Sequence, residues 1–228
     1  MSRSLKVAVS WSAGKDSCFS LYRALSSGLE AQFLLNMVNR DAARSMSHGL
    51  DPQLIAAQAQ ALEIPIIQPE TTWESYEQDF KAAIAGLKRS GIEGVVFGDI
   101  DIEGHKQWVE RVCGELEVIA ILPLWQDEPR RLLDDFVQAG FEAIVVSAKA
   151  ECFGDEWLGR PLTAELVEEL SRLGTQTGIH PCGEQGEYHT FVTDGPIFTG
   201  RIKVVDSRKV LREGYRFLDI TSYRTESK

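Results

Sequence analysis

The chain has 228 residues, of which 43% are hydrophobic and 25% charged, the ordinary balance of a globular protein with one large domain or a medium and a small one. Its formal net charge of −10 disfavours non-specific binding to nucleic acid, and no stretch reaches the ~20 apolar residues of a membrane span. Four scattered cysteines without a CxxC pair, and an N-terminus that runs directly into the first apolar segment without room for a signal peptide, predict a reduced, cytoplasmic protein.

The first half of the chain alternates strand-like and helix-like segments. Apolar runs at 6–12, 32–39, 65–70, 94–100 and 118–125 predict five strands. Helical periodicity follows the first four of them, at 15–25, 51–64, 76–91 and 108–116. Nearly continuous apolar strands that alternate with helices are typical of a parallel sheet covered on both faces. We therefore expect an α/β domain over residues 1–125, with a doubly wound, parallel, five-stranded sheet.

After Trp125 the pattern changes. Segments 128–141 and 163–174 predict helices, 143–148 predicts a strand, and short β segments follow at 187–193, 200–207, 209–213 and 215–223. Glu213 and Gly214 suit a hairpin turn between the last two. These elements predict a smaller α+β domain over residues 126–228, and the absence of a linker predicts that it packs tightly against the first.

A short polar segment, Ser12-Ala13-Gly14-Lys15-Asp16-Ser17, separates the first predicted strand from the first predicted helix. It is not a P-loop, because a P-loop requires Gly where Val9 stands and Ser or Thr where Asp16 stands. Small residues let backbone N–H groups approach anionic oxygens, and the positive end of the following helix points at the same place. The segment therefore predicts a cradle for phosphates.

The side chains of this segment support that prediction. Ser12 and Ser17 add hydroxyl donors and Lys15 adds a mobile cation. Asp16 would repel phosphate by itself, so we expect it to fix the loop or to help hold Mg²⁺. The alternative is an ordinary strand-to-helix turn capped by Ser and Asp.

The six residues closely resemble the SGGxDS signature of the PP-loop ATP pyrophosphatases. The resemblance implies that the loop grips the β and γ phosphates of ATP, while an acceptor attacks the α-phosphate and pyrophosphate leaves. Ala13 replaces the usual glycine, and its methyl group is tolerable if φ at this residue is negative, as we expect.

Five segments together resemble the diphthine–ammonia ligase family, in the same order as in that family: SWSAGKDSCFSLYRAL, GVVFGDI, VCGELEVIAILPLW, GFEAIVVSA and HPCGEQGEYHTFVTDGPIF. The stretch CGEQGEYHTF is similar to the family's GEGGEYET element, but Gln185 replaces a Gly and His189 replaces a Glu. The second change removes a carboxylate and bears on the identity of the substrate.

This resemblance implies an ATP-dependent amidation in the cytoplasm. A substrate carboxylate is adenylated with release of pyrophosphate, and ammonia then displaces AMP. In the family the substrate is diphthine, the modified histidine of elongation factor 2. The sequence leaves two alternatives open: a ligase that acts on a small-molecule carboxylate such as a cofactor precursor, and an ATP-binding sensor without catalysis. ATP, ammonia and Mg²⁺ are the expected ligands, and a homodimer is a candidate assembly.

Ligands of open α/β sheets bind at the carboxyl ends of the strands, which selects the residues of the first domain. Asn36, Met37 and Val38 are expected to frame adenine. Gly98 is expected to let the nucleotide approach the backbone. Asp99 is expected to bind metal together with Asp16, although Asp99 and Asp101 also suit a solvated turn.

The second domain is expected to supply the substrate side of the site. The GEQGEY element gives Gly183, Glu184, Gly186, Glu187 and Tyr188 as substrate-binding residues, and His48 joins them from the first domain. Glu184 and Glu187 are expected to be catalytic together with Lys15 and Asp16, because paired carboxylates bind Mg²⁺ or orient ammonia. The alternatives are a charged hairpin and a surface histidine.

Overall fold

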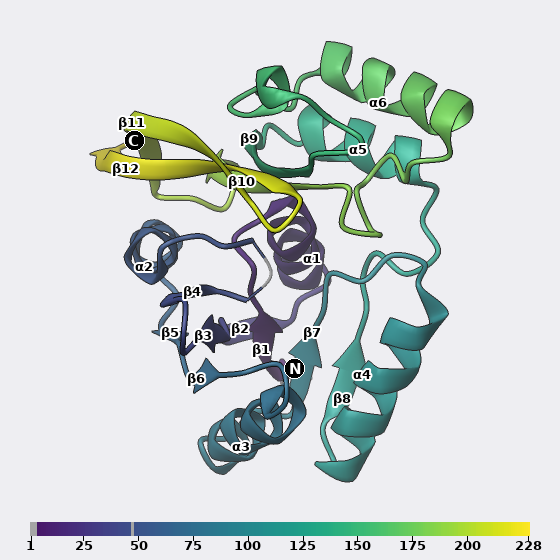
Figure 1. Cartoon of the computed structure of the whole chain (residues 1–228). Coiled ribbons are helices and arrows are strands. Elements are labelled where there is room, and N and C mark those ends of the chain that lie inside the picture. The colour runs from purple at the N-terminus through teal and green to yellow at the C-terminus, as the bar shows by residue number, and fades with distance from the viewer. Residues whose placement is uncertain (1–3, 47) are drawn as a thin grey trace.

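The computed structural model describes residues 4–46 and 48–228 (Figure 1). Residues 1–3, which belong to the N-terminal stretch where we expect no signal peptide, lie outside the described residues, as does residue 47.

The first domain is built on a parallel sheet of five strands. Its strand order is β5-β2-β1-β7-β8, and the strands are β1 (Lys6–Ser10), β2 (Glu30–Leu35), β5 (Ile66–Ile67), β7 (Gly94–Val96) and β8 (Ile119–Ile121). All four neighbouring pairs run parallel. The predicted parallel five-stranded sheet is confirmed.

Helices cover both faces of this sheet (Figure 1). They are α1 (Lys15–Ser26), α2 (Pro52–Ala61), α3 (Tyr76–Arg89) and α4 (Glu103–Glu115). Successive residues of a strand point to opposite faces, so Val7 and Val9 pack with α1 and α2 while Ala8 packs with α3 and α4. The doubly wound arrangement is thus confirmed.

The second domain contains α5 (Pro129–Gln138), β9 (Glu142–Lys149), a 3₁₀ turn (Asp155–Trp157), α6 (Ala164–Thr177), β10 (Tyr188–Asp194), β11 (Gly200–Arg212) and β12 (Tyr215–Ser227). Its strands form an antiparallel sheet in the order β10-β9-β12-β11. The expected separate strands 200–207 and 209–213 are in fact the single strand β11. Glu213 and Gly214 both have positive φ, 49° and 81°, which is the backbone of the predicted two-residue hairpin turn.

Several predicted strands of the first domain are shorter than expected. The segment 32–39 divides into β2 and β3 (Val38–Asn39), and β3 joins β4 (Arg44–Ser45) and β6 (Glu70–Thr71) in a small second sheet. The segments 94–100 and 118–125 likewise leave the sheet after Val96 and Ile121. The carboxyl ends of the central strands therefore become loops, and these loops face the second domain.

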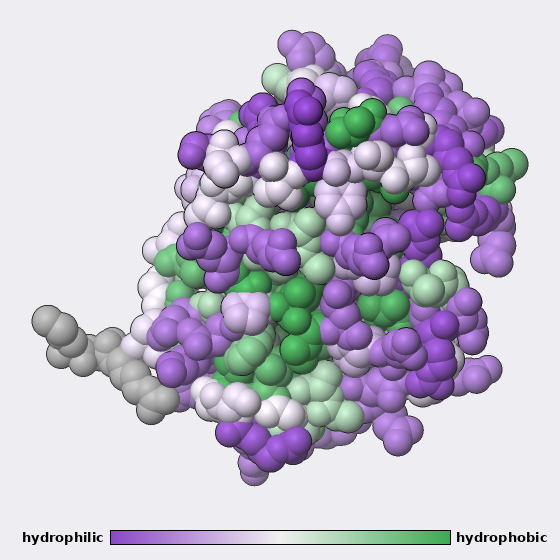
Figure 2. Space-filling view, turned by 90° about the vertical axis from the view of Figure 1, so that its left-hand side faces the viewer, coloured by the Kyte–Doolittle hydropathy of each residue, from purple (hydrophilic) through white to green (hydrophobic). Residues whose placement is uncertain are grey.

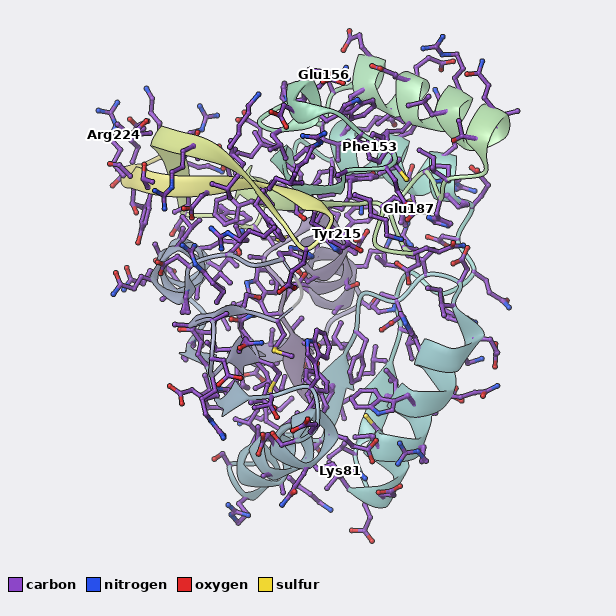
Figure 3. All side chains as sticks on the ribbon, in the orientation of Figure 1. Lys81, Phe153, Glu156, Glu187, Tyr215 and Arg224 are labelled. Carbon is purple, nitrogen blue, oxygen red and sulfur yellow. The ribbon has the colours of Figure 1, made fainter. Side chains whose placement is uncertain are left out.

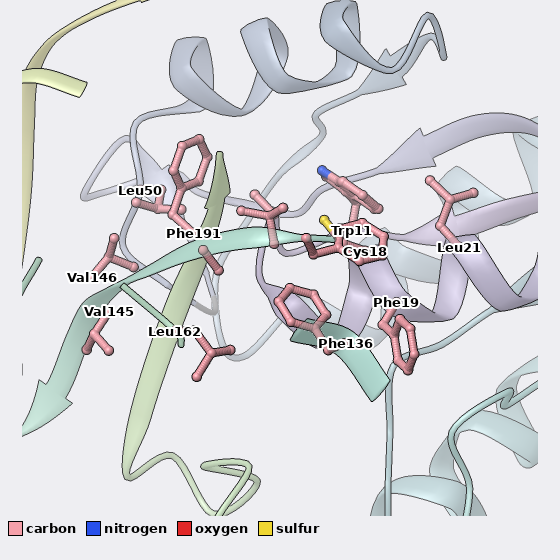
Figure 4. Close-up of a cluster of buried hydrophobic side chains, with 14 of the residues drawn as sticks. Trp11, Cys18, Phe19, Leu21, Leu50, Phe136, Val145, Val146, Leu162 and Phe191 are labelled. Atoms are coloured by element: carbon pink, nitrogen blue, oxygen red, sulfur yellow. The ribbon is translucent and has the colours of Figure 1, made fainter. Parts of the chain in front are cut away.

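The two domains share one hydrophobic core. A continuous cluster of buried side chains runs from β1 and α1 to α5, β9 and β10, and Figure 4 shows part of it around Phe19, Phe136 and Phe191. Phe19 of α1 contacts Phe136 of α5 edge to face, with 5.8 Å between ring centroids. The second domain is therefore held against α1 by packed rings, as the missing linker predicts.

The face that carries α2 and the edge strand β5 is partly apolar. Figure 2 shows apolar side chains gathered in the middle of this face, between more polar regions above and below. Within residues 4–46 and 48–228, no helix combines the length and apolarity that crossing a bilayer requires.

Candidate active site

The loop 12–17 begins where β1 ends and turns directly into α1. Gly14 is the N-cap of α1 and has extended backbone. A Cβ at this position would overlap the ring of His48 and would lie 3.0 Å from the Thr190 carbonyl oxygen. Glycine is therefore needed at position 14, because the loop lies tightly between the His48 ring and β10.

Hydroxyl groups brace the loop from within. The Ser12 hydroxyl donates to Ser17 Oγ at 3.2 Å, and the Ser17 hydroxyl lies 3.1 Å from the Gly14 carbonyl oxygen. The first-turn N–H groups of a helix have no intrahelical partner and attract anions. Because the Lys15 N–H donates to Thr190 Oγ1, the following two N–H groups, those of Asp16 and Ser17, are the candidate phosphate donors.

Ala13 overturns one expectation. Its φ is +69°, in the left-handed region, whereas a negative value was expected. The conformation is held because the Ala13 carbonyl accepts hydrogen bonds from Val192 N at 3.0 Å and from Gln58 Nε2 at 3.1 Å. The glycine usual at this place in the signature thus suits the backbone, and alanine adopts it at a cost of about 1 kcal/mol.

Lys15 is a buried cation between the two domains, with 3% of its surface exposed. Its ammonium donates to Asp16 Oδ2 at 2.8 Å and to the Cys182 carbonyl, and it lies 5.1 Å from the centre of the Tyr188 ring. Burial alone would lower the pKa of Lys15, but the Asp16 carboxylate beside it holds that pKa above its ordinary value. Lys15 therefore stays protonated and is paired with the Asp16 carboxylate.

The loop 180–187 of the second domain is shaped by its own side chains. Both carboxylate oxygens of Glu187 accept backbone hydrogen bonds, from His180 N at 2.7 Å and from Gln185 N at 3.0 Å, and the residue is 4% exposed. The Tyr188 hydroxyl donates to the Pro181 carbonyl, and Gly183 and Gly186 have positive φ. Glu187 thus holds the loop closed; Figure 3 shows it beside the hairpin tip at Tyr215.

Glu184, by contrast, contacts the first domain directly. Its Oε1 accepts a hydrogen bond from Ile100 N at 3.1 Å. Ligand atoms of Asp99, His105 and Glu184 all lie within 4.8 Å of one another. Burial, followed by the Asp16 and Asp99 carboxylates, raises the pKa of Glu184 to about 8. A divalent cation would relieve this crowding of negative charge.

Gly98 brings the loop after β7 against the loop 12–17. A Cβ here would lie 3.0 Å from the Asp16 carbonyl carbon and 3.1 Å from Ser17 N. The strand order reverses between β1 and β7, which is the switch point where open α/β sheets bind ligands. Asp16, Gly98, Asp99 and Glu184 are therefore brought close together at the switch point.

The three residues expected to frame adenine lie nearby but are engaged in internal contacts. The Asn36 amide donates to the Trp11 carbonyl at 2.8 Å and to Ser45 Oγ at 3.1 Å. The Met37 carbonyl accepts from Met46 N, and the Met37 and Val38 side chains are buried. The structure thus uses these residues to join β2 to the small second sheet, and their contact with adenine stays a prediction.

Two protein-family models match the chain, one over each of the two domains. The family model of the diphthamide synthase N-terminal domain matches residues 5–120, and that of the diphthamide synthase C-terminal domain matches residues 128–225. The chain belongs to the diphthamide synthase family.

Individual relatives of this diphthamide synthase family member carry the name diphthine–ammonia ligase. A protein of Schizosaccharomyces pombe is 30% identical over 90% of this chain, which spans 37% of that longer protein. A protein of Danio rerio is 29% identical over 95% of both chains. A solved structure, described as a predicted subunit of tRNA methyltransferase from Methanocaldococcus jannaschii, aligns with a TM-score of 0.46 at 15% identity, over 82% of this chain and 96% of that one.

His48 is buried in this family member, which excludes the alternative of a surface histidine. Its ring stacks on that of His189 with 4.5 Å between centroids, and 8% of the residue is exposed. Burial, with the neighbouring His189 and Lys15, lowers the pKa of His48, and burial lowers the pKa of His189 to about 4. The substitution of His189 for glutamate thus replaces a carboxylate by a neutral ring.

Sequence reasoning missed His105 and Thr190. His105 Nδ1 lies 3.2 Å from the Asp99 carboxylate, and its only signal is a place in the first turn of α4, shortly after the Gly98–Asp101 loop. Thr190 contacts Lys15 N across 175 residues of sequence, and no local pattern reveals such a contact.

Proposed function

We propose that this member of the diphthamide synthase family is an ATP-dependent amide ligase that adenylates a substrate carboxylate and amidates it with ammonia. The observation that carries the proposal is the cradle at the switch point. There the start of α1, the buried cation of Lys15 and the closely approaching Gly98 lie together beside the second domain. The names of the relatives support the same reaction.

The reaction proceeds in two displacements. An oxygen of the substrate carboxylate bonds to the α-phosphorus of ATP while the bond to the bridging oxygen breaks, and pyrophosphate leaves with that electron pair. The nitrogen of ammonia then bonds to the acyl carbon, AMP leaves, and the nitrogen loses one proton. Lys15 and the N–H groups of Asp16 and Ser17 stabilise the charge that develops on pyrophosphate, because they are fixed before the reaction begins.

The remaining residues of the site would hold a cation or position other residues. Asp99 and Glu184 offer the carboxylate oxygens that Mg²⁺ prefers, with His105 beside them, and a bound Mg²⁺ would neutralise the phosphate oxygens. Glu187 is a positioning residue, since its contacts shape the loop that carries Glu184. Diphthine of elongation factor 2 is one candidate substrate, and a small-molecule carboxylate is the other.

The test is the product pattern of the full chain. We expect AMP and pyrophosphate, in equal amounts, from Mg-ATP and ammonium only when an acceptor from a panel of carboxylic acids or diphthine-bearing elongation factor 2 is present. Lys15→Met is expected to lower AMP formation by about 100-fold or more, because a preorganised charge at the leaving group contributes about 3 kcal/mol. Lys88→Met, on the exposed end of α3, is the matched control.

Two results would count against the proposal. Formation of ADP would place the attack on the γ-phosphate. Tight ATP binding without AMP from any acceptor would favour the sensor.

A further inference from the structure

The loop 180–187, which lies between α6 and β10, makes two neighbouring links to the loop 98–101 of the first domain (Figure 1). Glu184 Oε1 accepts from Ile100 N, and the ring of His180 meets the carboxylate of Asp101, with 3.0 Å between Nε2 and Oδ2. The His180 side chain is 11% exposed. His180 is therefore a nearly buried ring that bridges the two domains beside a candidate cation ligand.

Side chains satisfy much of the backbone of this loop. The carboxylate of Glu187 accepts from two of its N–H groups, and both of these bonds stay within the loop. His180 Nδ1 accepts from two others, Cys182 N at 3.2 Å and Glu184 N at 3.4 Å. His180 differs from Glu187 because its other ring nitrogen reaches Asp101 of the first domain. The His180 ring thus connects the backbone of the loop to the first domain.

The two N–H donors decide where the ring carries its proton. A neutral imidazole has one proton, and a nitrogen that accepts hydrogen bonds does not hold it. Because Nδ1 of His180 faces the N–H groups of Cys182 and Glu184, the proton lies on Nε2, and Nε2–H donates to Asp101 Oδ2. The opposite tautomer would place an N–H against two N–H groups. One tautomer therefore satisfies both nitrogens of the ring.

Both residues that donate to the ring carry groups of the proposed reaction. The Cys182 carbonyl accepts from the ammonium of Lys15, which is 3% exposed. The Glu184 carboxylate belongs to the candidate cation cluster. A contact that fixes the N–H of a residue in a turn also limits where its carbonyl and its side chain can lie. One ring thus acts on the cation beside the loop 12–17 and on a candidate metal ligand.

We propose that His180 is a positioning residue of the ligase reaction. As the Nε2–H tautomer, its ring holds the Cys182 carbonyl against Lys15 and the Glu184 carboxylate beside Asp99, with Asp101 as its fixed point in the first domain. This role rests on the proposed function, in which Lys15 stabilises pyrophosphate and Glu184 offers an oxygen to Mg²⁺. Replacing a residue that orients a metal ligand typically changes metal affinity or activity by about 10–100-fold.

The tautomer is measured by NMR of the ¹⁵N-labelled full chain. Long-range ¹H–¹⁵N correlations distinguish a protonated from an unprotonated ring nitrogen, and the chain contains four histidines. His180→Asn identifies the signals of His180 by their loss. We expect a protonated Nε2 and an unprotonated Nδ1 near neutral pH.

Two variants break the bridge and one keeps it. His180→Asn retains an acceptor for Cys182 N, because an Asn side chain can accept from the N–H two residues on, but it is too short to reach Asp101. Asp101→Ala removes the acceptor of Nε2–H, whereas Asp101→Asn keeps a carbonyl oxygen there.

The affinity for Mn²⁺, measured by electron paramagnetic resonance, reports whether Glu184 is held in place. We expect His180→Asn and Asp101→Ala to weaken Mn²⁺ binding about tenfold, and Asp101→Asn to stay within about threefold of the unmodified chain. Asp41→Ala, at an exposed position of the first domain, is the matched control.

The same variants separate positioning from stability. Positioning of Lys15 and Glu184 acts on the transition state, so both bridge variants are expected to lower kcat for AMP formation about tenfold, with little change in the KM for ATP. The double variant His180→Asn/Asp101→Ala is expected to lose no more than either single variant, because all three break one link. A purely structural role would lower the free energy of unfolding and leave kcat of the folded protein unchanged.

Four results would overturn the proposal. They are a proton on Nδ1 of His180, unmodified Mn²⁺ affinity in both bridge variants, no Mn²⁺ binding by the unmodified chain, and equal losses in Asp101→Asn and Asp101→Ala, which would assign the effect to charge. The NMR and Mn²⁺ measurements need no turnover. If both give the expected results while no acid yields AMP, the ligase reaction is contradicted and the positioning of Glu184 by His180 stands.

Discussion

Gly14 shows how closely the loop 12–17 is enclosed. We expect Gly14→Ala to lower the free energy of unfolding by about 2 kcal/mol or more, because the new methyl group would overlap His48 and press on the Thr190 carbonyl. Gly114→Ala is the matched control. A Cβ at Gly114 meets nothing within 4 Å, so alanine in this helix is expected to add up to about 1 kcal/mol. Urea unfolding of the two variants measures both changes, and equal stabilities would contradict the crowding at Gly14.

His189 makes stability depend on pH. Its folded-state pKa is lowered to about 4 by burial, so between about pH 6.5 and 4 the unfolded chain binds a proton that the folded chain does not. Stability is therefore expected to fall as the pH falls through this window. His189→Gln removes the proton-binding group, and its Tm is expected to drop less between pH 7 and 4.5 than that of the wild type. Identical drops would show that His189 titrates normally.

Residues 12–17 and Glu184 are recognisable from sequence as candidate site residues because short motifs carry them. Their partners are not. Thr190 and the Cys182 carbonyl reach Lys15 from 175 and 167 residues away, and only the packing of the second domain on α1 brings them there. The positive φ of Ala13 is likewise imposed by contacts with β10 and α2, which outweigh the intrinsic preference of alanine.

Helix α2 anchors the loop 12–17 to β10 through one side chain. Gln58 Nε2 donates to the Ala13 and Val192 carbonyls, at 3.1 and 2.6 Å, and Gln58 Oε1 accepts from the Trp11 indole at 3.0 Å. Gln58→Leu removes one hydrogen bond each from three buried groups, namely the Trp11 indole N–H and the Ala13 and Val192 carbonyls. We therefore expect the free energy of unfolding, measured in urea, to fall by about 2–3 kcal/mol. Gln60→Leu, exposed on the same helix, should change stability by less than about 0.5 kcal/mol. If both variants lost similar amounts of stability, the effect would come from substitution in the helix and not from the hydrogen bonds of Gln58.

The elements themselves follow the sequence closely where periodicity is strong. The predicted helix 51–64 contains the observed α2, with Asp51 capping Gln53 N and Pro52 in the first turn. Strand lengths were less predictable, because apolar residues after Leu35 and Val96 stay buried although the chain has left the sheet. Met37 and Phe97 pack in the core from loops, and hydrophobicity alone does not distinguish such loops from strands.

At the scale of the whole molecule, groups from both domains meet at the switch point. His180 Nε2 of the second domain lies 3.0 Å from Asp101 of the first, while His180 Nδ1 accepts from Cys182 N at 3.2 Å. The shared core fixes the two domains against each other, so Glu184 and Asp99 meet without a linker that would let them separate. Binding of a cation at this point should therefore require a carboxylate from each domain.

Mn²⁺, observed by electron paramagnetic resonance as a substitute for Mg²⁺, tests this requirement. Asp99→Asn and Glu184→Gln are each expected to weaken Mn²⁺ binding by about tenfold or more, because each removes a charged ligand. Burial and the Asp16 and Asp99 carboxylates raise the pKa of Glu184 to about 8, so the ion must displace a proton and should bind more tightly at pH 9 than at pH 7.

Glu103→Gln is the matched control for these variants, since Glu103 lies in the first turn of α4 but outside the cluster. If Asp99→Asn alone weakens binding and Glu184→Gln behaves like the control, the ion belongs to the first domain only. The crowding of acids around Glu184 would then need another cation, and Lys15, held 2.8 Å from Asp16, is the charge already in place to supply it.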